Sequence, residues 1–177
     1  MYPEQKNVVV YLLEEEMAAA VAADQPDDEG RMMSDWVSVF VRVDEYDRAL
    51  PLCEKCLAKR SRVFGEDHPS TLESLHALAG IFCFKDEYDR ALPLLEECLA
   101  KRKRVLGEDH PDTLTSLNNL ADIFFHKGEY DRALPLFEEC LAKRKSVFWL
   151  PLGTSVRVTR SVQKDRDRCA QRLQASL

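Results

Sequence analysis

The sequence repeats itself with a period of 42 residues. Residues 45–86 and 87–128 form two consecutive blocks that match at 30 of 42 positions, and a third block opens with the same eight residues at Glu129. Self-similarity at a fixed period of this size indicates stacked supersecondary units, each of which buries its apolar side against its neighbours. The period therefore predicts a repeat array.

Two apolar stripes with helical spacing alternate within each block. We name the corresponding helices A and B, in chain order. The A stripe, which recurs 42 residues later, consists of Leu75, Leu78, Ala79 and Phe82, and the following B stripe of Ala91, Leu92, Leu95, Cys98 and Leu99. Residues at i, i+3, i+4 and i+7 share one face of a helix. Every strong periodicity is helical, so the sequence predicts an all-α protein.

Glycine and proline mark the ends of these helices. Gly65 and Gly107 follow the B helices, where a residue with positive φ ends a helix, and Pro69 and Pro111 begin the next A helices. A further proline lies in each B segment, for example Pro93. A proline is tolerated there only near a helix start, so B helices should begin near the Asp that precedes each proline by four residues.

The blocks resemble tetratricopeptide repeats. The resemblance rests on the spacing of large, small and aromatic residues at Leu78, Ala79, Phe82, Ala91 and Cys98. The 42-residue period and the turn Gly-Glu-Asp-His-Pro at 65–69 and 107–111 look like the kinesin-light-chain subtype. The resemblance implies an α-solenoid: helix-turn-helix repeats stacked into a short right-handed superhelix, with A helices lining a concave groove that binds a partner.

Three segments follow from the repeat boundaries. Residues 31–148 form the array, about 2.5 to 3 repeats, with a divergent first A helix carrying Met33, Trp36, Val37 and Phe40. We expect residues 1–30 to be a divergent cap, with a helix over 7–23 and an acidic loop from Asp24 to Glu29. Residues 149–177 form a divergent basic tail. It is expected to be poorly ordered or a capping helix, with binding to an acidic surface as the alternative.

Composition excludes several classes of function. A net charge of −6 and a pI near 5.3 argue against nucleic-acid binding, which needs clustered cations. No run of about 18 apolar residues could span a membrane, and the short apolar run near the N-terminus is a poor signal peptide. We therefore expect a soluble, cytoplasmic protein with no nucleic-acid or membrane partner.

Candidate chemical sites have simpler structural explanations. Six cysteines are expected as free buried thiols, and Cys53 and Cys56, a C-x-x-C pair, occupy core positions of their repeat. His68 and His110 recur at one turn position, which indicates a role at a helix start. Runs of Lys and Arg at the ends of B helices are expected to be solvated. We predict no catalytic residue, no metal and no cofactor, and hence no enzyme.

The differences between the two complete blocks point to a binding face. Of 12 mismatches, six lie on the A-helix side away from the core stripe, whereas exposed B-helix positions differ little. The resemblance places that side in the groove. The candidate partner-binding residues are Glu73, His76, Ala77, Gly80, Phe84, Thr115, Asn118, Asn119, Asp122, Phe125 and His126. They include no Lys or Arg, so a preference for acidic peptides is not expected.

The sequence thus favours an interaction scaffold that holds a partner protein or peptide in its groove. The alternative is a purely structural or self-associating fragment of a larger protein. A third block without a recognisable cap would leave Leu136 and Phe137 exposed enough to drive homodimerisation.

Overall fold

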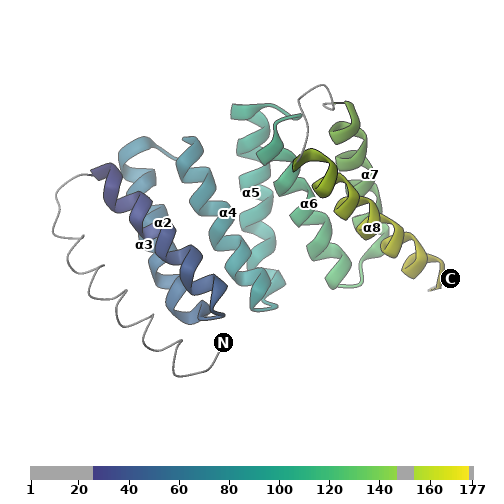
Figure 1. The fold of residues 1–177 in the computed structure, drawn as a ribbon, viewed down its shortest axis with the longest axis horizontal. Helices are drawn as coiled ribbons and strands as arrows, with labels where there is room; N and C mark the ends of the chain where they lie inside the picture. The colour runs from purple at the N-terminus through teal and green to yellow at the C-terminus, as the bar shows by residue number, and fades with distance from the viewer. Residues whose placement is uncertain (1–25, 147–153, 176–177) are drawn as a thin grey trace. The chain divides into compact units, whose positions relative to one another are not determined.

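The computed structural model describes residues 26–146 and 154–175, and the side chains of 33–145 and 159–175. Every regular element in these ranges is a helix. The chain divides into two compact units, residues 1–85 and 86–177. The first holds α2 (Pro26–Arg42), α3 (Tyr46–Phe64) and α4 (Pro69–Phe84). The second holds α5 (Tyr88–Leu106), α6 (Pro111–His126), α7 (Tyr130–Ser146) and α8 (Thr154–Ala175) (Figure 1).

Neighbouring helices pack against each other within each unit. In the first unit α3 contacts both α2 and α4; in the second, α6 contacts α5 and α7, and α8 contacts α7 and, over a smaller area, α6 (Figure 1). The A helices of the repeats are α2, α4 and α6, and the B helices are α3, α5 and α7. These helical pairs confirm the all-α repeat prediction.

The predicted core stripes are buried. Ala79 and Ala121 have no exposed surface, and the large residues of both A stripes are at most 7% exposed. On α2, Trp36, Val37 and Phe40 are also buried, as projection of the period predicts. In the second unit the core includes Phe137 of α7 together with Val162 and Cys169 of α8.

The turn from a B helix to the next A helix is built identically in both units. Gly65 ends α3 with φ +90, and the Thr71 hydroxyl donates to its carbonyl at 2.8 Å. The imidazole Nδ1 of His68 accepts from the Ser70 N–H at 3.2 Å, so His68 is the N-cap of α4. The same bonds recur at Gly107 and His110. The histidines are therefore helix caps, as expected from their repetition.

Two arginines at the ends of B helices are buried, contrary to the prediction that these runs are solvated. Arg60 is 6% exposed and donates to the Ser74 hydroxyl at 2.8 Å and to a first-turn carbonyl of α4. Arg102 is 5% exposed and makes the equivalent bonds to Ser116 and the Asp112 carbonyl. A buried guanidinium needs acceptors, and the first turn of the next A helix supplies them. Each arginine thus ties a B helix to its successor.

The B helices begin where their prolines require. They start at Tyr46, Tyr88 and Tyr130, one residue before the expected aspartates. The A–B turns before them have positive φ at one repeat position, occupied by Asp44, Asp86 and Gly128. These residue types tolerate that conformation better than others do.

The N-terminal end of the array differs from expectation, whereas the tail takes the helical form that was one of the two alternatives. Helix α2 begins at Pro26, so residues 26–29, predicted as part of an acidic loop, are its first turn. Proline at the first position and acidic residues in the first turn both favour a helix start. The tail forms α8, which packs on α7. The helix predicted over 7–23 lies outside the described residues.

Two glycines in equivalent surroundings should respond oppositely to alanine. Gly107 has φ +92 and ψ 162, a region accessible almost only to glycine, so Gly107→Ala should destabilise the protein by about 1–3 kcal/mol. Gly80 lies inside α4, and Gly80→Ala should stabilise by about 0.5–1 kcal/mol. A Cβ would meet nothing within 4 Å at either site, so packing does not confuse the comparison. Urea denaturation measures both; equal effects would contradict the backbone assignment.

Candidate functional site

The candidate residues of α4 lie on its unburied side. Glu73 and Phe84 are exposed, and His76, Ala77 and Gly80 are partly exposed. The opposite side of α4 packs against α3. The first unit therefore presents this set as one helix face, as the periodicity predicts.

The equivalent face of α6 belongs to the second unit. Thr115, Asn118, Asn119, Asp122 and Phe125 are partly exposed, and His126 is exposed. The Thr115 hydroxyl donates to the Pro111 carbonyl at 2.9 Å, one turn back along the helix. All six residues are thus unburied, but several make contacts within the unit.

The last residue of each face stacks on a tyrosine. Phe84 lies parallel to the Tyr46 ring with centroids 5.7 Å apart, and His126 lies on Tyr88 at the same separation. Next to each stack, Lys85 pairs with Asp47 and Lys127 with Asp89, both at 2.6 Å. One side of the Phe84 and His126 rings is therefore occupied by the B helix that precedes the A helix in the same unit.

Asp122 is only partly exposed. Its position on the A-helix side away from the core stripe had suggested a residue that faces solvent. Asn118 Nδ2 donates to its carboxylate at 2.9 Å, and Asp165 and Arg168 of α8 lie close by. Burial, and secondly the negative charge of Asp165, raise the pKa of Asp122 to about 7, although Arg168 opposes the shift. Among the described residues no hydrogen-bond partner exists for the buried Oδ1 of Asn118. This part of the α6 face is therefore a partly buried polar seam with α8.

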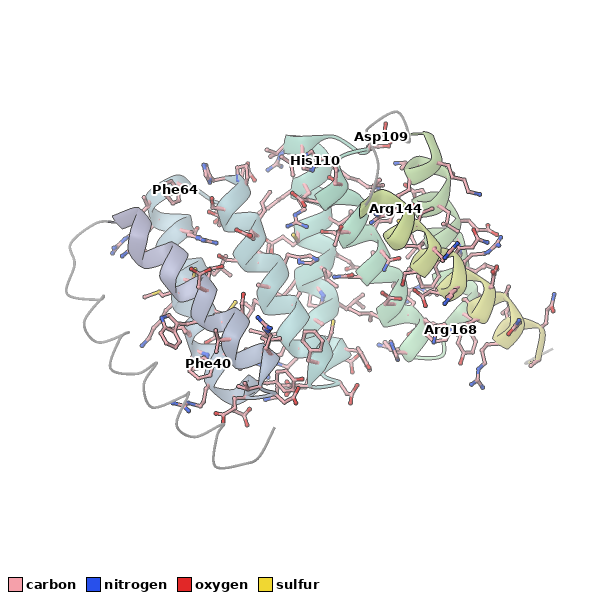
Figure 2. All side chains as sticks on the ribbon, viewed as in Figure 1. Phe40, Phe64, Asp109, His110, Arg144 and Arg168 are labelled. Carbon is pink, nitrogen blue, oxygen red and sulfur yellow. The ribbon has the colours of Figure 1, made fainter. Side chains whose placement is uncertain are left out.

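Phe125 joins the α6 face to the core. Its ring packs partly against the core of the second unit and makes edge contacts with Tyr130 at 5.4 Å and His126 at 5.6 Å. The guanidinium of Arg168, labelled on α8 in Figure 2, lies 5.7 Å from the ring centroid. The α4 and α6 faces lack Lys and Arg, but α8 brings a cation beside Phe125. Sequence reasoning missed Arg168 because it treated the tail separately from the array.

The cysteines form no chemical centre. All six are free, and only Cys83 is more than slightly exposed. The Cys53 thiol donates to the Ser74 carbonyl, and burial is the main cause that raises its pKa to about 12. In residues 26–146 and 154–175, no group of three His, Cys, Asp or Glu side chains could hold a metal ion. The C-x-x-C pair is therefore core packing.

Repeat geometry, turn chemistry and buried stripes agree with a comparison of the sequence with protein families. The family model described as tetratricopeptide repeat matches residues 28–104 and 75–146, from α2 to the end of α7. The chain belongs to the tetratricopeptide repeat family. Tetratricopeptide arrays generally act as protein-interaction scaffolds, with stacked helices that form extended binding surfaces. A comparison with curated protein sequences gave no match.

Solved tetratricopeptide structures share the fold. One is a candidate kinesin light chain from Podosopora anserina with nearly identical TPR-like repeats: 23% identity, 84% of this chain and 68% of that chain covered, TM-score 0.73. Another is BtubC (BKLC) from P. vanneervenii: 20% identity, 97% and 74% covered, TM-score 0.71. Both likenesses concern the fold, which is that of kinesin light chain-like repeat proteins. None of the helices in the described part of this chain is long and apolar enough to cross a membrane.

Proposed function

We propose that this tetratricopeptide protein binds an extended or helical segment of a partner protein on the unburied faces of its A helices. The observation that carries the proposal is the distribution of differences between two nearly identical blocks. Six of 12 mismatches fall on the unburied faces of α4 and α6, while the A stripes, the turns at 65–69 and 107–111 and the buried arginines are the same in both blocks. Scaffold residues repeat, and surface residues that a ligand would touch differ.

Most B-helix positions are the same in the two blocks. Arg60 and Arg102 are buried, so their identity reflects packing. Exposed B-helix positions such as Glu54 and Glu96 are unchanged as well. Ordinary surface drift would alter these positions as readily as the A-helix faces.

The chemistry of the α6 face fits a peptide backbone with an apolar side chain. Asn119 is partly exposed, and its amide carries both donors and an acceptor, which match backbone N–H and C=O groups. The partly exposed ring of Phe125 offers an apolar contact. Binding without a cofactor or a catalytic step is the function that this face supports.

Self-association through Leu136 and Phe137 is the weaker candidate. Phe137 has no exposed surface, and Leu136 is partly buried against the core, so this pair leaves less apolar surface exposed than the sequence suggested. We also propose a cytoplasmic location and no nucleic-acid or membrane partner. Net acidity supports the absence of nucleic acid, and thiols placed in core positions support a reducing compartment.

A swap between equivalent repeat positions tests the proposal with side chains that the preceding block already carries at those positions. Thr115→Glu with Asn119→Ala gives α6 two residues that α4 carries at Glu73 and Ala77. The matched control, Glu97→Lys with Lys103→Ser, swaps B-helix residues in the same way. Random peptides of about 12 residues, displayed on phage, are selected on the wild-type chain and measured by calorimetry.

The face swap should weaken the selected peptides at least about tenfold, which corresponds to about 1.4 kcal/mol, and the control swap should leave their affinity unchanged. Recovery of no binding peptide would count against the proposal. Equal affinity for wild type and face swap would place the binding surface elsewhere.

A further inference from the structure

The described part of α8, residues 159–175, makes a small apolar contact with the second unit. Among its side chains only Val162 and Cys169 are buried, and the Cys169 thiol donates to the Tyr130 carbonyl at 3.4 Å. Two small side chains contribute little apolar burial for this stretch. Polar contacts therefore matter for the docking of this part of α8.

The contact between α6 and α8 holds one carboxyl group from each helix, Asp122 of α6 and Asp165 of α8, whose side chain is 17% exposed. Arg168, which pairs with Asp165, lies 5.7 Å from the centroid of the Phe125 ring, about one turn after Asp122. Like charges that share a partly buried site disfavour the doubly ionised state. In the preceding block the position of Asp122 is Gly80, so the fold of an A helix does not need a carboxylate there.

We propose that the pair Asp122 and Asp165 makes the docking of α8 on α6 proton-dependent, so that α8 is held more firmly in acidic solution than at neutral pH. A protonated Asp122 removes the cost of burying its charge and, secondly, the repulsion by Asp165, and an ionised Asp122 restores both. The proposal concerns α8 alone and does not depend on the binding of a partner.

Other groups near Asp122 do not account for this behaviour. From α8, Arg168 pairs with Asp165 and partly offsets its charge. From α7, Cys140 has a pKa raised mainly by burial, so its thiol stays neutral in this range. On α6 itself Asn118 is neutral, and its donated hydrogen bond favours the ionised carboxylate without outweighing burial. His126, one turn further, is exposed and stacks on Tyr88.

The pH window follows from the two pKa values of Asp122. It is about 7 with α8 docked, and the ordinary value near 3.8 applies when the carboxyl is exposed to water. Between these values docked Asp122 is protonated and undocked Asp122 is ionised, so the docking constant falls up to about tenfold per pH unit as pH rises. Above the docked pKa both states are ionised, and the docking constant becomes independent of pH.

Hydrogen–deuterium exchange of the full chain tests this, with protection factors corrected for intrinsic exchange. In wild type, protection of α8 relative to α5 should fall at least about tenfold between about pH 5 and pH 7 and then level off. Asp122→Asn should remove the slope. Asp167→Asn, an exposed carboxylate of α8, is the matched control and should keep it.

Two outcomes would overturn the proposal: a flat wild-type profile, or a slope that persists in Asp122→Asn, which would assign the titration to another group. If Asp122→Asn does not fold, Asp122→Gly introduces the residue of the preceding block and must give the same flat profile.

Discussion

Phe137→Ala should lower the free energy of unfolding by about 3–5 kcal/mol, the typical loss for a large aromatic residue removed from a core. Phe137 has no exposed surface and lies in the core cluster of the second unit, together with Leu117 of α6 and Val162 of α8. Urea denaturation followed by circular dichroism measures the loss. Glu138→Ala changes the exposed neighbour and should stay within about 0.5 kcal/mol.

A loss below about 1 kcal/mol for Phe137→Ala would mean that Phe137 lies at the surface. That is where the alternative of a self-associating fragment places it. The variant therefore separates a core closed by α8 from an open end available for dimerisation.

Ala121→Leu should destabilise by about 1–3 kcal/mol, or more if the backbone cannot yield. Ala121 has no exposed surface in the core of the second unit, so a larger side chain must push packed helices apart. Because a repeat array passes damage mainly to neighbouring repeats, exchange should accelerate more around residues 114–146 than around 33–60. Uniform acceleration would indicate one cooperative unit, and none would mean that the core stripe is misassigned.

The helices, their turns and the core stripes could be predicted because the residue patterns that indicate them occur more than once in the sequence. A stripe that recurs 42 residues later, bounded by Gly107 and Pro111, leaves few alternatives. The cap role of His110 followed from the same repetition, although the bond from the Asp112 N–H needed the structure.

Features that depend on contacts between distant segments could not be predicted from repetition in the sequence. Arg60 and Arg102 look like members of solvated basic runs, and only their bonds to the next A helix show that they are buried. Their identity in both blocks was a signal, but Lys59 and Lys101 are identical too. A residue that repeats in both blocks is therefore not necessarily a buried one.

The tail was the hardest part to predict. Its apolar residues are sparse, and over residues 159–175, where side chains are described, α8 buries only Val162 and Cys169, so the helical stripe there is weak. Without α8, Asp122 appeared solvent-facing and the face appeared free of cations. The candidate face itself was predicted from internal differences, and the structure adds the residues of α8 that border it.

The most direct measurement is chemical-shift mapping by nuclear magnetic resonance on the labelled full chain, titrated with a peptide selected on wild type. The account predicts that the largest shifts fall on unburied A-helix residues, such as Thr115, Asn119 and Phe125 of α6 or Glu73 and His76 of α4. Shifts gathered on the exposed sides of the B helices, for example at Glu96 and Glu138, would contradict it.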